Sequence, residues 1–174
     1  ISYDDEAFNK GEYGATTADG VLKARKAVCE GYSNLFSALC KASGLTAKKV
    51  VGHSKAYGYV TGQKMGDTDH AWNVVRINEK WRLFDVTWAS GSASTSKNGK
   101  IVSTNKFDDY WFIVNPREFI FTHLPEQSSW QLLPLAERLS ITQFENLPYI
   151  RSSFFRIWFN TKYIYDNAIK GRIK

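Results

Sequence analysis

The chain has 174 residues, 43% of them hydrophobic and 15% aromatic, which suits one folded domain and excludes a disordered chain. No apolar run approaches the roughly 18 residues of a membrane span, so we expect none. The net charge of +6 comes without a recognisable nucleic-acid-binding module, so we expect no nucleic-acid partner. The first residues, 1–5, read as the middle of a longer protein. We therefore expect additional domains in the full-length protein, and both an extracytoplasmic and a cytoskeletal location stay open.

The first quarter of the chain contains one clear helix. Residues 1–20 are polar with three glycines and predict irregular structure, followed by a short link over 21–27. From 29 to 43, apolar residues recur at intervals of three and four, which predicts an amphipathic helix with one apolar stripe. Gly44 follows as a helix terminator.

The middle of the chain predicts a sheet. Residues 48–53 read as a strand, and 54–69 as a polar loop with a short strand at 57–60 as an option. Strand-like segments at 70–77 and 81–87 then flank residues 78–80, which predict a tight hairpin turn.

The remaining segments give weaker signals. Residues 89–106 predict either a mobile loop or the tip of a long hairpin, and 110–114 an aromatic strand. Short apolar runs broken by prolines over 117–150 predict a segment that wraps the domain. The aromatic stretch 154–165 reads as a last strand or as the start of a following domain.

The two cysteines, Cys29 and Cys40, lie in one predicted helix and cannot pair with each other. Eleven residues at ~1.5 Å each separate them by about 16 Å, whereas a disulfide needs Cα atoms within about 7 Å. Cys29 begins the helix, where first-turn N–H groups and the helix dipole favour a thiolate nucleophile. The alternative is a small buried hydrophobic residue, which suits Cys40.

His70 and Asp85 are the other candidates for catalysis. His70 begins a strand just after a polar loop, where a ligand could reach it, although a single histidine is more often structural. Asp85 interrupts an apolar strand, and orienting a histidine would supply the partner that a buried carboxylate needs. Trp88 would shield that hydrogen bond, or simply pack in the core. His53 and His123 have no comparable partners and are interpreted as structural.

The predicted hairpin leaves a geometric conflict. A turn at 79–80 would pair Asp85 with Val74, four residues from His70. That separation is ~13 Å along a strand, too far for a direct hydrogen bond. A bulge, a strong twist or a different register would be required.

Metal chemistry is a weaker alternative for these residue types. Asp67, Asp69 and His70 are close in the sequence, but the chain has no H-x-x-x-H or C-x-x-C spacing. Glycine-rich phosphate loops are also absent. We therefore predict neither a metal ion nor a cofactor.

Several blocks together resemble one known family. They are Ala27–Ser33, His70–Asn73, Trp81–Trp88 and Phe144–Pro148, and in this order they are similar to the transglutaminase-like superfamily, more narrowly to its kyphoscoliosis-peptidase-like branch. The similarity covers about residues 1–155, which we predict to be the domain, with 156–174 as a C-terminal extension or the start of a following domain. The resemblance implies helices before residues 1–5, so we expect part of the core, or an upstream oxyanion donor, to lie outside this chain, with Tyr13 as a weak substitute for that donor.

The resemblance implies an α+β, papain-like/transglutaminase-like fold in which a nucleophile helix packs on an antiparallel sheet. It also implies acyl transfer through a thioester on a protein or peptide substrate. Cys29 would attack the carbonyl and its backbone N–H would donate to the oxyanion, His70 would shuttle the proton, and Asp85 would hold the imidazole.

The same resemblance implies roles for residues near the site and leaves the reaction open. Tyr32, Trp72 and Trp88 are the expected supporting residues. Water as acceptor would give a peptidase or isopeptidase, whereas an amine would give glutamine cross-linking. A non-catalytic protein-interaction scaffold with a vestigial site is the alternative function.

Overall fold

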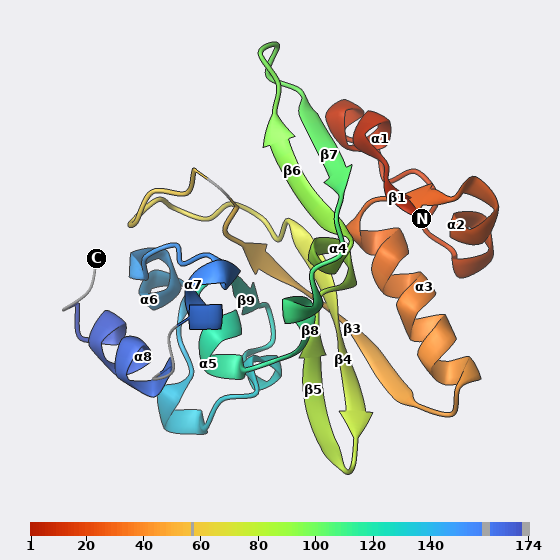
Figure 1. Cartoon of the computed structure of the whole chain (residues 1–174). Coiled ribbons are helices and arrows are strands. Elements are labelled where there is room, and N and C mark those ends of the chain that lie inside the picture. Colours follow the sequence, from red (N-terminus) through yellow and green to blue (C-terminus); the bar gives the residue numbers. More distant parts are fainter. Residues whose placement is uncertain (57, 158–160, 172–174) are drawn as a thin grey trace. The chain divides into compact units, whose positions relative to one another are not determined.

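The computed structural model describes residues 1–56, 58–157 and 161–171 (Figure 1). The chain divides into two compact units. The first unit comprises Ile1–Lys49 and Ala71–Ile113, and the second unit comprises Val50–His70 and Val114–Lys174. Neither unit is a continuous stretch of sequence, because the chain crosses from one to the other three times.

The N-terminal segment is more regular than its composition predicts. It contains β1 (Ser2–Tyr3), α1 (Asp5–Lys10), α2 (Ala18–Ala24) and β2 (Lys26–Ala27). The side chain of Asp4 accepts a hydrogen bond from Ala7 N, and that of Thr17 accepts one from Gly20 N, so each helix has an N-cap. The expectation of irregular structure over 1–20 is wrong because such short helices depend on their caps and on tertiary packing rather than on a repeating apolar pattern.

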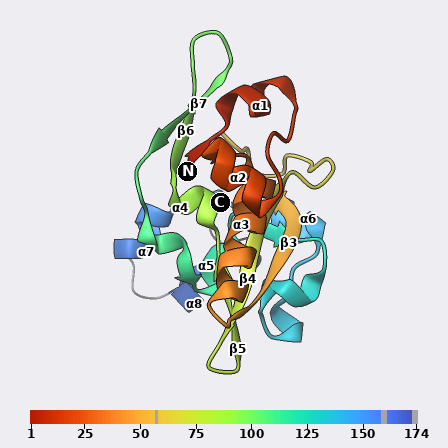
Figure 2. The same cartoon turned by 90° about the vertical axis from the view of Figure 1, so that its right-hand side faces the viewer.

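The predicted amphipathic helix is confirmed as α3 (Cys29–Ala42). Cys40 on its apolar stripe packs in one core cluster with Val75 and Phe84 of the sheet, and Phe36 lies against the same cluster. A polar link adds to this packing, since Asn73 Nδ2 donates to Ser33 O at 3.0 Å and to Ser37 Oγ at 2.9 Å. Figure 2 shows α3 alongside β4. The expected packing of the nucleophile helix on an antiparallel sheet is therefore present within the first unit.

Five strands form the main sheet, in the order β8-β5-β4-β3-β9. Their bounds are β3 (Thr46–Ser54), β4 (His70–Ile77), β5 (Lys80–Phe84), β8 (Phe112–Val114) and β9 (His123–Pro125). The β4–β5 pair is antiparallel, as predicted, and its turn residues Asn78 and Glu79 both have positive φ values, 49° and 62°. Primed turns of this kind match the twist of the flanking strands.

The observed register corrects the expected pairing of Asp85. Ile77 pairs with Lys80, so Val74 lies opposite Leu83 and Asn73 opposite Phe84. The predicted Val74–Asp85 pairing is wrong because the turn occupies residues 78–79 and not 79–80. The predicted strand 81–87 also ends early, at Phe84, because Asp85 begins a short helix, α4 (Val86–Ala89).

The segment predicted as a loop or a long hairpin is a hairpin. It consists of β6 (Gly91–Thr95) and β7 (Ile101–Asn105), which lie beside α1 (Figure 1). The carboxylate of Asp5 accepts hydrogen bonds from the backbone N–H and hydroxyl of Ser103, and Asn9 exchanges two hydrogen bonds with the backbone of Ile101. The N-terminal helix thus anchors the hairpin.

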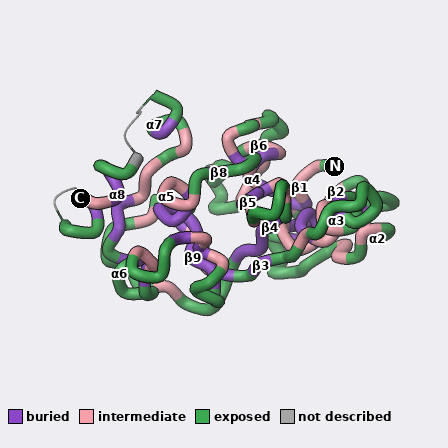
Figure 3. The backbone as a smooth tube through the Cα atoms, turned by 90° about the horizontal axis from the view of Figure 1, so that it is seen from below, coloured by how far each residue is buried: buried purple, intermediate pink, exposed green. Residues whose placement is uncertain are grey.

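The second unit combines β9 and the second half of β3 with short helices. These are α5 (Pro116–Phe119), α6 (Ile141–Asn146), α7 (Ser152–Ile157) and α8 (Thr161–Ile169), with 3-10 turns at Ser128–Gln131 and Leu135–Glu137. In the register of β3 with β9, His53 pairs with Leu124. Buried residues make up β9 and occur within α8 (Figure 3).

The aromatic C-terminal stretch folds as helices. Residues 154–157 belong to α7 and 161–165 to α8, so the expectation of a strand there is wrong for the described residues, and 158–160 lie outside them. The optional strand at 57–60 is likewise absent from the described residues 58–60, while residue 57 lies outside them. A further 3-10 turn, Asp109–Trp111, precedes β8. Among the helices of the described ranges, none combines the length and apolar character needed to cross a membrane.

Candidate functional site

Cys29 is the first residue of α3 and a free, half-buried thiol. Its N-cap residue, Val28, is extended and makes no side-chain capping hydrogen bond. The first-turn N–H groups of α3 are therefore not taken up by a cap side chain, and they are oriented to interact with negative charge at this end of the helix. A thiolate at this position would be stabilised by these N–H groups.

Asp85 is fully buried and forms the N-cap of α4. Its Oδ1 accepts hydrogen bonds from Thr87 N and Trp88 N, both at 2.9 Å, and its own N–H donates to Trp111 O at 3.0 Å. Hydrogen bonds from two backbone N–H groups stabilise a charged carboxylate in a buried position. The sequence identified the buried Asp85 but assigned it to a strand, because a cap on a four-residue helix leaves no periodic pattern.

The three expected supporting residues lie in the first unit with different degrees of burial. Trp88 is half-buried and packs edge-on against Trp111, with ring centroids 4.8 Å apart. Trp72 is fully buried in β4. Tyr32 lies near the start of α3 and belongs to a core cluster of the first unit. Its hydroxyl donates to Ile1 O at 3.1 Å. Burial raises the pKa of Tyr32 above its ordinary value, so it remains neutral.

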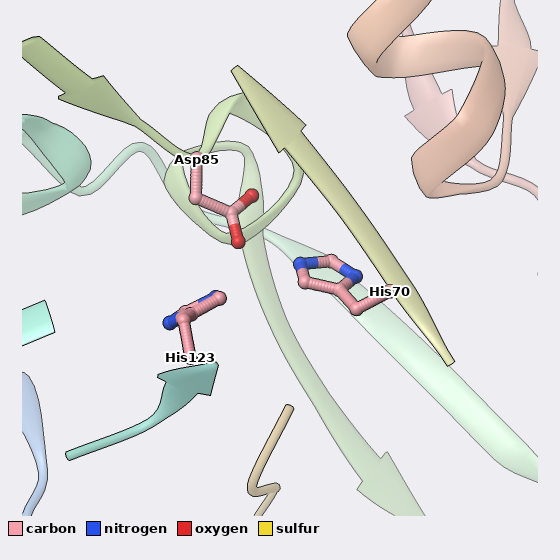
Figure 4. Close-up of side chains that lie close together, drawn as sticks. All are labelled: His70, Asp85 and His123. Atoms are coloured by element: carbon pink, nitrogen blue, oxygen red, sulfur yellow. The ribbon is translucent and has the colours of Figure 1, made fainter. Parts of the chain in front are cut away.

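His70, at the beginning of β4, is buried and lies near a second histidine of its unit. The ring centroids of His70 and His123 are 5.4 Å apart, and the planes are tilted by 44° (Figure 4). His123 stacks on Phe119 at 4.0 Å, and its Nδ1 is 2.8 Å from the hydroxyl of Thr122. Sequence reasoning interpreted His123 as structural, because a partner 53 positions away in the sequence has no local signal.

The loop that leads into His70 is fastened within the second unit. Ser54 N donates to the Asp69 carboxylate at 2.7 Å, and Asp69 N donates to Gly52 O at 3.0 Å. Further back, the buried Glu145 accepts from Lys64 Nζ at 2.8 Å and from Met65 N at 2.9 Å. These contacts fix the loop at both its centre and its end, directly before the imidazole.

The candidate residues are distributed over both units. Cys29 and Asp85 belong to the first unit, and His70 ends the 50–70 segment of the second unit.

Comparison with known sequences agrees with this arrangement of helix, thiol and sheet. The sequence model of the transglutaminase-like superfamily matches residues 1–86, which include Cys29, His70 and Asp85. The chain belongs to this superfamily. Its α+β, papain-like core is the fold expected of such a member.

The similarity to individual members of the superfamily points to the branch of kyphoscoliosis peptidase. The mouse (Mus musculus) kyphoscoliosis peptidase is 37% identical over 156 residues, which are 89% of this chain and 23% of that protein. Hillarin of Drosophila melanogaster is 35% identical over 149 residues, covering 80% of this chain and 18% of hillarin. Cytokinesis protein 3 of Schizosaccharomyces pombe is 26% identical over 141 residues, covering 78% of this chain and 15% of that protein. The chain thus spans less than a quarter of the length of these curated relatives.

Proposed function

We propose that this transglutaminase-like domain catalyses cysteine-dependent acyl transfer on protein or peptide substrates through a thioester. The observation that carries the proposal is the position of Cys29 as the first residue of α3, with no capping side chain before it. A thiolate there is stabilised by backbone N–H groups, and the N–H of Cys29 itself would donate to the substrate oxyanion.

The β4–β5 register supports a partnership of His70 with Asp85. Asn73 lies opposite Phe84, so one further step along the ladder matches Trp72 with Asp85, whose backbone stays extended at φ −119° and ψ 92°. His70 is two residues from Trp72 and therefore on the same face of β4. In the observed register Asp85 is no longer matched with Val74, four residues from His70.

The reaction assigns one role to each residue. His70 takes the proton of Cys29, and the thiolate sulfur attacks the substrate carbonyl carbon to form a tetrahedral oxyanion. The oxyanion collapses to the thioester as the amine leaves with the proton from His70. Water or a second amine then attacks the thioester, which regenerates the thiol. Asp85 orients the imidazole and stabilises its charged form.

Three substitutions test the proposal in parallel. Cys29→Ala should abolish turnover, because no other group can form the thioester. His70→Ala should cost more activity than Asp85→Asn, since the base is removed in the first and only its orientation in the second. For Asp85→Asn, a drop on the order of 10²-fold or more agrees with other triads. Incorporation of a labelled amine into a glutamine-containing protein would identify cross-linking, and cleavage of a peptide library would identify a peptidase.

The second candidate function is a non-catalytic interaction scaffold. It is favoured by the similarity to a relative named for cytokinesis rather than for an enzymatic activity. A scaffold would show neither amine incorporation nor peptide cleavage, in the full-length protein as well as in this domain. It would also bind its protein partner equally well with Cys29→Ala. The absence of both activities together with this unchanged binding would contradict the enzymatic proposal.

A further inference from the structure

Tyr3 lies beside the segment that leads into Cys29. Strand β1 runs parallel to β2, and Tyr3 is opposite Ala27, two residues before the nucleophile. On either side of this pair, Ser2 N donates to Arg25 O at 3.0 Å and Asp4 N donates to Ala27 O at 2.9 Å. The backbone of Tyr3 is therefore held in place next to the beginning of α3.

The Tyr3 side chain packs near the segments that contain Cys29 and Asp85, the two candidate residues of the first unit. It lies against a core cluster that contains Ala27 and Tyr32, which flank Cys29 in the sequence. Val86, the residue after Asp85, packs against the same cluster. The ring also contacts Phe8, with centroids 5.8 Å apart. These contacts confine the phenol to the region of the first unit where α3 and α4 begin.

The charges around the phenol agree with this placement. Burial is the main cause that raises the pKa of Tyr3 well above its usual range. Negative charge on Cys29 raises this pKa further, ahead of the contributions of Asp5 and Asp85. A phenol with a raised pKa remains protonated at neutral pH and can only donate its O–H to an anion.

We propose that Tyr3 is a further catalytic residue of the Cys29 centre, whose hydroxyl donates a hydrogen bond to the substrate oxyanion. This inference rests on the proposed acyl transfer. When the sulfur–carbon bond forms, the carbonyl π electrons move to oxygen, and Tyr3 donates to that oxygen without losing its proton. When the oxyanion collapses, the carbonyl is restored and the hydrogen bond weakens. The O–H would act together with the backbone N–H of Cys29.

The sequence offered a different tyrosine for this role. Tyr13 is 70% exposed, so its hydroxyl is solvated and poorly suited to stabilise charge in a buried site. Tyr3 could not be predicted for this role, because a two-residue strand such as β1 has no sequence signature and the strand that it pairs with, β2, is 24 positions away.

The test compares two reactions of Cys29 in a Tyr3→Phe variant. Acylation by p-nitrophenyl acetate passes through a tetrahedral oxyanion, and the burst of p-nitrophenolate measures it. Alkylation by iodoacetamide displaces iodide directly and forms no oxyanion. We expect Tyr3→Phe to slow acylation on the order of 10²-fold, the usual effect of removing one oxyanion donor, and to leave the alkylation rate unchanged.

The matched control is Tyr13→Phe, which removes an exposed hydroxyl and should change neither rate. Equal acylation rates in Tyr3→Phe and the unsubstituted chain would overturn the inference. So would a parallel loss of acylation and alkylation, since that indicates a disturbed Cys29 rather than a missing donor. If Cys29 of the unsubstituted chain alkylates but is never acylated, the proposed acyl transfer itself fails, which is a distinct result.

Discussion

The two thiols of the chain lie in different surroundings. Cys29 is half-buried at the N-terminus of α3, whereas Cys40 is 6% exposed in the core, where burial raises the pKa of its thiol. The thiolate is the species that alkylates, so a buried thiol with a raised pKa reacts slowly. We expect brief iodoacetamide treatment at neutral pH to label Cys29 well before Cys40, as measured by peptide mass spectrometry.

A Cys29→Ala variant provides the control for that labelling. It should take up almost no label during the same exposure, which confirms that Cys40 is protected in the folded chain. Labelling of both cysteines at equal rates, or of Cys40 first, would contradict the assignment of Cys29 as the accessible nucleophile.

Lys55 is a buried cation of the second unit whose charge responds to pH. It is 0% exposed, its Nζ donates to Leu147 O at 2.8 Å and to Phe144 O, and the Phe144 ring lies 4.1 Å away. Desolvation lowers the pKa of Lys55 from 10.5 to about 7, against the opposing attraction of Glu145. Between these two pKa values the unfolded chain binds more protons than the folded one.

The sign of the pH effect follows from that difference. The folded state gains stability as pH rises from about 7 toward 10.5, and this gain is lost as pH falls through the folded pKa. In urea unfolding at pH 6, 8 and 9.5, we expect the unsubstituted chain to gain stability relative to Lys55→Met as the pH increases. The exposed Lys97→Met variant should show no such trend. If the unsubstituted chain instead lost stability relative to Lys55→Met as the pH rises, the lowered pKa would be contradicted.

At the scale of elements, α3 approaches its neighbours most closely at Gly31. A Cβ at this position would lie 2.3 Å from Ala15 O, 2.6 Å from the Ala27 side chain and 2.9 Å from that of Val21. Alanine is the better helix former by up to ~1 kcal/mol, but overpacking of this kind costs typically about 1–3 kcal/mol. The clash involves a backbone oxygen that cannot simply rotate away. We therefore expect Gly31→Ala to destabilise the chain by about 1–2 kcal/mol in urea unfolding.

Gly66→Ala is the control for this substitution. It has no atom within 4 Å of the added Cβ and no positive φ, so stability should hardly change. If Gly31→Ala were as stable as Gly66→Ala, α2 and α3 would have to pack less closely than described here.

Glu145 on α6 fastens the loop that precedes His70. Its carboxylate accepts from Met65 N and Lys64 Nζ, and its carbonyl oxygen accepts from Gly62 N at 2.7 Å. Lys64 is 77% exposed, so the ion pair adds little, and the part-buried hydrogen bond from Met65 N contributes more. We expect Glu145→Ala to cost about 1–3 kcal/mol of stability.

The local consequence is measurable by limited proteolysis. Trypsin should cleave after Lys64 faster in Glu145→Ala than in the unsubstituted chain, since the loop opens without its anchor. The exposed Glu126→Ala should leave cleavage unchanged. Protection of Lys64 in both variants would show that the loop does not depend on the Glu145 side chain.

At the scale of the whole molecule, the interleaving of the units determines which truncations the chain tolerates. The predicted domain boundary at residue 155 remains a hypothesis that a truncation can test. Beyond it, α8 contributes Ile164 and Tyr165 to the core of the second unit, at 3% and 1% exposure, and the Tyr165 hydroxyl donates to Glu137 O. Burying each such side chain contributes roughly 1.5–3 kcal/mol.

We therefore expect a chain ending at residue 155 to lose about 3–5 kcal/mol of unfolding free energy, measured by urea denaturation. A chain ending at residue 171 removes only residues outside the described ranges and is the matched control. Equal stability of the two chains would support the boundary at 155 and assign 156–174 to an extension.

Local sequence patterns determined the parts of this protein that depend on near neighbours in the chain. The three-to-four spacing of apolar residues defined α3, and the run between His70 and Phe84 defined a hairpin. The blocks around Cys29, His70 and Asp85 identified the superfamily. These features were predictable because helical periodicity, turn residues and short sequence blocks are each set by near neighbours in the sequence.

Only the tertiary structure decided how distant segments meet. The turn lies at 78–79 and not at 79–80, so Asp85 is out of register with Val74. Asp85 instead forms the N-cap of α4. The tertiary structure also set Tyr3 opposite Ala27 and enclosed Lys55 among carbonyl groups more than 80 residues away. Such contacts leave no local pattern, because any polar or aromatic residue can occupy them once the surrounding core is formed. The physical reason is that register and burial are properties of the packed chain, whereas periodicity and capping are properties of a segment.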